Sequence, residues 1–138
     1  MDRGVSLPAG FDAMRAFLHA QWEDGGRRSE DLAILLGSLD RGTAQDGAPA
    51  DPAQWSDWID AVLTVRPDLK GRIEDGGVTI GPGEAFEAMR AFLAAYWERG
   101  GRTERGIGEI AEALDRDRAT AGLQQRWSAA VRMAQPRS

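Results

Sequence analysis

The stretch from Phe11 to Gly26, FDAMRAFLHAQWEDGG, returns 75 positions later as Phe86 to Gly101, FEAMRAFLAAYWERGG. Aligned without gaps from Phe11 to Arg41 against Phe86 to Arg116, 16 of 31 positions are identical, well beyond what shared composition gives. The sequence is therefore interpreted as two copies of one unit.

The repeated stretch has the spacing of an amphipathic helix. Its apolar residues recur at i, i+3, i+7 and i+11, which places them on one helical stripe facing a core: Phe11, Met14, Leu18 and Trp22. Gly25-Gly26 is predicted to end the helix near Asp24, because glycine adopts positive φ at little cost. The stretch is thus chiefly a packing unit.

Two more helices follow in each copy. In the first copy we predict one from Glu30 to Leu39 and one that starts at Asp51-Pro52, where Asp caps and Pro fits the first turn. That helix is expected to fade before Pro67. In the second copy the connecting loop is six residues shorter, and the last helix ends before Pro136.

The predicted fold is all-α, with two tandem three-helix repeats packed into one pseudo-twofold helical bundle. The first repeat covers residues 1–66 and a second, degenerate repeat covers 84–138, with a Gly/Pro-rich linker at 67–83. Within the linker, Leu69 to Ile73 is expected to form one turn. Gly77 to Ile80 has the composition of a short strand, which is marginal alone, and its pairing with the similar tetrapeptide Gly4 to Leu7 is left open.

Composition limits the class of protein. The chain has 138 residues, no cysteine, and no run of 18 apolar residues, and its first residues lack a basic segment followed by an apolar one. We therefore expect neither disulfides nor a membrane span nor a signal peptide, which fits a cytoplasmic protein. Sixteen of the 17 basic residues are Arg, a usage typical of high-GC bacteria.

The net charge of −5 lies in the first copy. Residues 1–66 hold 11 acidic and six basic residues, whereas residues 67–138 hold 11 of each. The acidic residues concentrate in one segment, at Asp40, Asp46, Asp51, Asp57 and Asp60. This charge disfavours nucleic-acid binding by that surface and equally fits a solubilising surface.

Few residues are suited to catalysis. His19 is the single histidine and is expected at the surface, so no metal or cofactor site is expected. Glu23 and Glu98 each follow an equivalent Trp. They are predicted to complete hydrogen bonds at a helix end or between helices, with a shared acidic site between the copies as the alternative. Gly25-Gly26-Arg27 follows a helix rather than preceding one, so it is a helix stop and not a phosphate loop.

The five tryptophans divide into two kinds. Four occur at equivalent positions of the two copies and are predicted core anchors: Trp22, Trp97, Trp58 and Trp127. Trp55 has no counterpart, because Gln124 stands in its place. It is interpreted either as a core residue or as an exposed hot spot for a protein partner.

The order AMRAFLHAQWE, EDLAILLGSLD, DGAPADPAQWSDWIDAV resembles a family of small bacterial all-helical immunity proteins of contact-dependent growth inhibition and related polymorphic toxin systems. The resemblance covers Leu7 to Val65 and, more weakly, Pro82 to Met133; its most specific piece is Asp51-Pro52-x-x-Trp55-x-Asp57-Trp58. It implies a non-catalytic inhibitor of a toxin domain, and an acidic surface would suit a basic toxin.

We therefore predict a non-enzymatic protein-binding module that carries no cofactor and binds neither nucleic acid nor membrane. The predicted partner surface is the acidic segment that the second copy does not reproduce: Asp46, Asp51, Trp55, Asp57 and Asp60. Two alternatives stay open. One is a structural or regulatory homo-oligomer that buries Trp55 against a second chain, and the other is a small carboxylate- or metal-dependent enzyme that uses Glu23 and Glu98.

Overall fold

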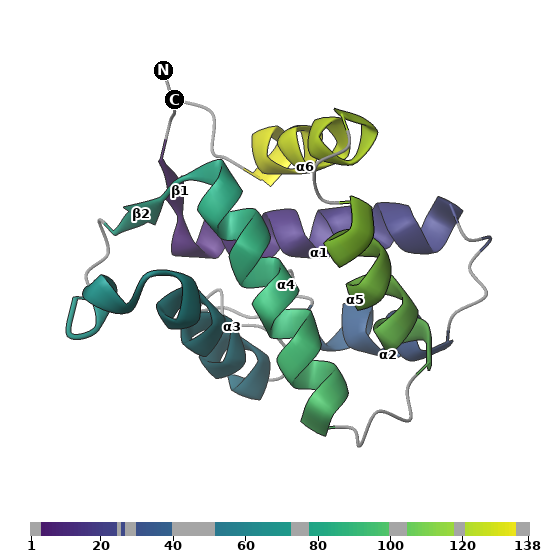
Figure 1. Cartoon of the computed structure of the whole chain (residues 1–138), viewed down its shortest axis with the longest axis horizontal. Helices are drawn as coiled ribbons and strands as arrows, with labels where there is room; N and C mark the ends of the chain where they lie inside the picture. The colour runs from purple at the N-terminus through teal and green to yellow at the C-terminus, as the bar shows by residue number, and fades with distance from the viewer. Residues whose placement is uncertain are drawn as a thin grey trace.

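The computed structural model describes residues 4–24, 26, 30–39, 52–72, 78–99, 105–117 and 121–134. Within these ranges the chain is almost entirely helical, which confirms the all-α prediction (Figure 1). The helices are α1 (Leu7–Asp24), α2 (Glu30–Ser38), α3 (Pro52–Val65), the short 3₁₀ turn η1 (Pro67–Leu69), α4 (Pro82–Arg99), α5 (Arg105–Asp117) and α6 (Ala121–Ala134).

The two long helices, α1 and α4, begin with side-chain caps of different kinds. Before α1, the Ser6 hydroxyl accepts a hydrogen bond from the Ala9 amide at 3.2 Å, the usual role of an N-cap serine. At the start of α4 the Glu84 carboxylate accepts one from the Gly81 amide at 2.8 Å, as in the second half of a capping box. Each cap satisfies an amide that the helix itself leaves unpaired.

The predicted glycine stop after α1 is confirmed. Gly26 has a φ of 77°, and its amide donates to the Glu23 carbonyl at 3.0 Å. A side chain at this φ would be strained, which explains why glycine stands here. The equivalent pair Gly100-Gly101 lies outside the described residues.

A two-stranded antiparallel ribbon joins the N-terminal end of α1 to that of α4. It consists of β1 (Val5–Ser6) and β2 (Thr79–Ile80), with Val5 opposite Ile80 and Ser6 opposite Thr79. This is the pairing that the sequence left open. Strands this short persist because Val5 and Ile80 are buried in the core, at 0% and 2% exposed. A 3₁₀ turn begins at Pro67, whose fixed φ suits the start of a helical turn. The turn expected at Leu69 to Ile73 follows it, because the Arg72 amide donates to the Leu69 carbonyl at 2.8 Å; Ile73 lies outside the described residues.

The helices pack crosswise: the first helix of each half lies against the third helix of the other half. Among the described residues, α1 makes its most extensive helix contact with α6, and α4 makes its most extensive contact with α3. Figure 1 shows α6 lying along α1 and α3 lying beside α4. The helices α2 and α5 also contact each other. One continuous hydrophobic core results, with residues from all six helices and from the ribbon.

Two tryptophans anchor this core. Trp58 on α3 and Trp127 on α6 are 0% and 1% exposed. Trp58 Nε1 donates to the Leu7 carbonyl at 3.1 Å, and Trp127 Nε1 donates to the Pro82 carbonyl at 2.8 Å. Both predicted anchors are therefore confirmed, and each ties a third helix to the start of a first helix.

The other pair of predicted anchors is less buried than expected. Trp22 and Trp97 lie in the last turns of α1 and α4, and both are half-buried against the edge of the core. The ends of these 18-residue helices extend to the margin of the bundle, where fewer neighbours cover the indoles.

In the described part of the chain, no helix has the length and apolarity needed to cross a bilayer.

Candidate functional site

The predicted acidic surface is only partly described. Asp46 and Asp51 lie outside the described residues. On α3, Asp57 forms an ion pair with Arg99 at the end of α4, with 2.5 Å between Oδ2 and Nη1. Asp60 is exposed, and its carbonyl accepts a hydrogen bond from the Thr64 hydroxyl at 3.0 Å. The carboxylate of Asp57 is therefore engaged within the fold, whereas Asp60 faces solvent.

Trp55 is neither fully buried in the core nor fully exposed, the two positions that the sequence left open. Its ring centroid lies 5.6 Å from that of Phe11 at an interplanar angle of 57°, and the residue is half-buried against the core. Phe11 in turn contacts Trp58 edge-on, at 6.3 Å. One part of the Trp55 indole thus packs on the core, and the rest stays at the surface of α3.

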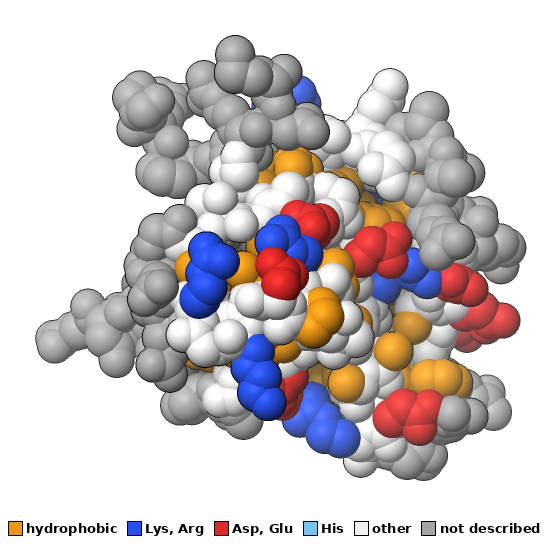
Figure 2. All heavy atoms as spheres, turned by 60° about the vertical axis from the view of Figure 1, so that its left-hand side comes forward, with side chains coloured by type: hydrophobic (Ala, Val, Ile, Leu, Met, Phe, Trp, Pro, Cys, Tyr) orange, Lys and Arg blue, Asp and Glu red, His pale blue; other side chains and the backbone are white. Residues whose placement is uncertain are grey.

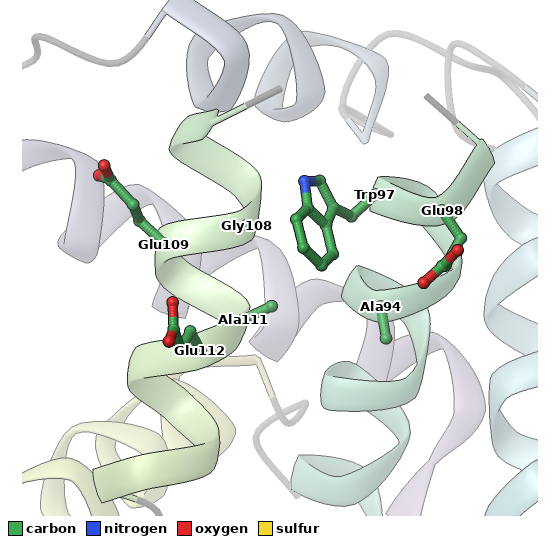
Figure 3. Close-up of a pocket in the computed structure, with 7 residues that line it drawn as sticks. All are labelled: Ala94, Trp97, Glu98, Gly108, Glu109, Ala111 and Glu112. Atoms are coloured by element: carbon green, nitrogen blue, oxygen red, sulfur yellow. The ribbon is translucent and has the colours of Figure 1, made fainter. Parts of the chain in front are cut away.

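A groove of about 560 Å³ lies between α4 and α5. It was not predicted. From α4 it is lined by Ala94, Trp97 and Glu98, and from α5 by Gly108, Glu109, Ala111 and Glu112. Figure 3 shows the Trp97 indole and Ala111 in the space between the helices, whereas Glu109 and Glu112 extend from the other side of α5 and Glu98 lies on α4 away from the indole. The described lining therefore combines one aromatic surface with three carboxylates and contains no Lys, Arg or His.

The floor of the groove depends on a close approach between the two helices. A Cβ atom placed on Gly108 would stand 2.8 Å from both Nε1 and Cε2 of Trp97, closer than van der Waals contact permits. Glycine at this position lets the indole lie directly against the α5 backbone. The three carboxylates lie at exposed positions, Glu98 on α4 and Glu109 and Glu112 on α5.

The equivalent positions in the first copy carry a different set of residues. Where the groove has Ala94 and Ala111, the first copy has His19 and Leu36. Where it has Glu109 and Glu112, the first copy has Ile34 and Gly37. Compared with the first stretch, the second therefore has alanine in place of two larger side chains and carries two additional carboxylates.

The sequence contained a signal for this groove. The replacements of Ile34 by Glu109 and of Leu36 by Ala111 are visible in the alignment of the two copies, but they are easily read as decay of a packing surface. Only the packing of α5 against α4 shows that Glu109 and Trp97 line the same groove. The sequence alone did not show which helix lies opposite.

The other residues that were considered for catalysis are His19, Glu23 and Glu98, and the structure does not bring all three to one site. His19 is on the surface of α1 as predicted, 3.7 Å from Glu23 and in edge contact with Trp22 at 5.7 Å. Glu98 lines the groove, and Glu23 is not among the described lining residues. Within the described part of the chain, no three His, Asp or Glu side chains are placed to hold a metal ion.

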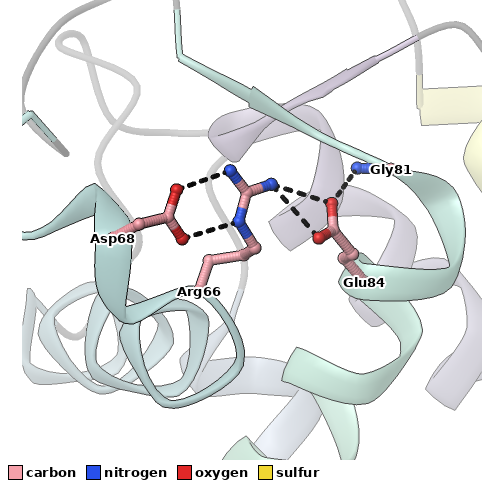
Figure 4. Close-up of polar contacts among 4 residues, drawn as sticks. All are labelled: Arg66, Asp68, Gly81 and Glu84. Carbon is pink, nitrogen blue, oxygen red and sulfur yellow. Dashed lines mark hydrogen bonds and ion pairs between the residues drawn. The ribbon is translucent and has the colours of Figure 1, made fainter.

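A second polar cluster joins the end of α3 to the start of α4. Arg66 donates through Nε and Nη2 to Asp68, at 2.9 and 2.8 Å, and through Nη1 to both oxygens of Glu84, each at 3.1 Å (Figure 4). Hydrogen bonding to Arg66 lowers the pKa of Asp68 below its ordinary value, and the same bond raises the pKa of Arg66. This cluster orients the chain between the two halves.

The face turned toward the viewer in Figure 2 carries acidic and basic side chains interspersed with small apolar areas. Acidic and basic side chains are mixed on that face, whereas the charged residues among the described lining of the α4–α5 groove are all acidic.

No protein-family model, no curated protein and no solved structure matches this chain.

Proposed function

We propose that this chain is a non-enzymatic protein-binding module, an immunity-type inhibitor that binds a toxin domain in the cytoplasm. The observation that supports this most directly is the α4–α5 groove, which offers an indole and three carboxylates. Aromatic side chains are enriched where proteins bind one another. The Glu side chains lie at exposed positions, whereas a general acid or base is normally held in a buried, polarised setting.

The charge of the groove favours a basic partner. Three carboxylates stand on one concave surface with no basic residue among the described lining residues. Complementary charge accelerates encounter and selects among partners more than it adds affinity. Asp60 and the surface part of Trp55 extend the proposed contact area on α3.

The experiment is a calorimetric titration of this chain with the toxin domain encoded beside it, together with an assay of that domain's activity. We expect saturable binding and loss of toxin activity. The absence of any such neighbouring gene, combined with the absence of a co-purifying protein, would contradict the proposal.

A second candidate function is a homo-oligomer, and two exposed apolar side chains favour it. Ile34 on α2 is 67% exposed and Met133 on α6 is 80% exposed, although single apolar residues at a surface are common. Sedimentation equilibrium separates the two functions. A monomer of 15.0 kDa supports the inhibitor, and a stable dimer supports self-assembly.

The crosswise packing supports a symmetric origin for this binding module. We infer that the two halves are tandem repeats related by a pseudo-twofold axis, with their third helices exchanged. The supporting pairs correspond between the two halves, since α1 with α6 matches α4 with α3, and Leu7 matches Pro82, 75 residues later, as acceptor of a Trp indole bond. A duplicated unit leaves one copy free to diverge, as the groove residues have done.

A further inference from the structure

The α4–α5 groove has the features of a site for a positively charged side chain. Its described lining pairs one half-buried indole, Trp97, with the carboxylates of Glu98, Glu109 and Glu112. A cation over an indole is attracted by the ring quadrupole, and the three carboxylates among the described lining residues give the groove a negative charge. Both features favour a cationic occupant.

The floor favours a flat group. Ala94, Gly108 and Ala111 are small, and Gly108 brings the α5 backbone against the indole. A guanidinium is planar, stacks on aromatic rings and binds carboxylates through fixed pairs of N–H donors, whereas an ammonium is a compact and strongly hydrated point charge. The shape therefore favours arginine over lysine.

The size of the groove indicates more than one bound side chain. Its volume is about 560 Å³, within the range of about 300–1,000 Å³ that is usual for ligand pockets. The three carboxylates are distributed over two helices, Glu98 on α4 and Glu109 and Glu112 on α5 (Figure 3). A short segment can lie along the groove with its arginine on Trp97 and its neighbours near the rim.

The geometry points to an arginine-bearing basic segment of a partner protein as the occupant of the α4–α5 groove. This inference rests on the proposed function, because it names the partner chemistry that the binding module recognises. It also assigns that recognition to the second copy. In the first copy, the equivalents of Ala111, Glu109 and Glu112 are Leu36, Ile34 and Gly37, which provide neither the open floor nor the two added carboxylates.

The test uses the intact chain labelled with ¹⁵N and follows the indole N–H signals of its five tryptophans. The probes are capped tripeptides, Gly-Arg-Gly, Gly-Lys-Gly and Gly-citrulline-Gly, and tetramethylammonium. Citrulline has the shape of arginine without its charge. We expect the Trp97 signal, assigned with Trp97→Phe, to shift saturably with the arginine peptide, and arginine to bind about fivefold or more tighter than citrulline.

Two variants locate the site. Glu109→Gln with Glu112→Gln removes two exposed charges without changing side-chain size, and it is expected to abolish the preference for arginine over citrulline. Glu30→Gln is the matched control, since it removes an exposed carboxylate on α2 that is not among the described lining residues of the groove; it should leave that preference unchanged. Both variants should unfold at the temperature of the parent chain.

Other outcomes would overturn the inference. Equal binding of arginine and citrulline would remove the charge argument, and equal or tighter binding of lysine or tetramethylammonium would define a general cation site. No shift of Trp97 with any probe would also overturn it. Titration of the toxin domain with the Glu109→Gln, Glu112→Gln protein separates the two proposals, because undiminished binding contradicts the groove and leaves the binding module intact.

Discussion

Gly108 on α5 lies so close to Trp97 on α4 that a Cβ atom at Gly108 would stand 2.8 Å from the indole Nε1. The contact fixes the spacing of the two helices at the floor of the groove. Any side chain added at Gly108 would displace the Trp97 indole. Substitutions at this glycine therefore probe the groove without altering its charge.

Gly108→Ala is expected to destabilise the chain by about 1–3 kcal/mol, the usual cost of overpacking, and to shift the Trp97 indole resonance. The matched control is Gly37→Ala on α2, where an added Cβ meets nothing within 4 Å. That variant should be neutral or gain up to about 1 kcal/mol from helix propensity. Urea denaturation measures both. Equal stability of the two variants would contradict the close packing.

Trp58 and Trp55 should respond differently to truncation, although they are three residues apart on α3. Trp58→Ala is expected to cost about 3–5 kcal/mol, because the indole is fully buried and its bond to the Leu7 carbonyl is lost. Trp55→Ala should cost clearly less, because Trp55 is half-buried. If Trp58→Ala does not fold, Trp58→Phe keeps an aromatic ring at this position and removes the Nε1 donor together with part of the indole, and a smaller loss than for alanine is expected. Comparable losses at both positions would place Trp55 in the core.

The Arg66–Asp68 pair gives a prediction for pH. Because hydrogen bonding to Arg66 lowers the pKa of Asp68 in the folded chain, the folded state binds fewer protons at this carboxyl than the unfolded state does. The stabilisation is present above the unfolded pKa and is lost as pH falls through the folded value. NMR titration of Arg66→Gln should show the Asp68 pKa rising toward its ordinary value. An unchanged pKa would show that the pair does not form in solution.

Crosswise packing predicts the behaviour of the isolated first half. A chain of residues 1–72 retains α1, α2 and α3 but lacks α4 and α6, the main partners of α3 and α1. Two such chains can supply each other with a third helix, so we expect a helical homodimer in light scattering. A folded monomer would show instead that α3 can pack onto its own α1.

Local signals in the sequence predicted most of the helices. Pro52, Pro67 and Gly26 mark ends that the structure reproduces closely, and the Phe11 stripe faces the core as its period indicated. Periodicity shows that a face will be buried and not which helix covers it. The packing of α6 on α1 and of α3 on α4 was therefore out of reach, as was the ion pair of Asp57 on α3 with Arg99 on α4.

The groove was missed for a related physical reason. Ala94 and Ala111 look like weak core residues in isolation, and a pocket exists only where two helices stand at a particular distance. That distance is set by Gly108 and Trp97, which lie on different helices. The predicted site residues were chosen for their charge along one segment, and Asp57 shows that such a charge can be engaged inside the fold.

The packing of α1 against α6 has a consequence for synthesis on the ribosome. The main partner of α1 begins at Ala121, about 100 residues after α1 ends, which corresponds to about 5–20 s of translation at ordinary rates. During that interval Phe17, whose ring packs edge-on against Trp127 of α6 at 5.8 Å, lacks its final cover. The nascent chain should therefore engage chaperones until its last helix emerges, and truncation within α6 should leave an aggregation-prone product.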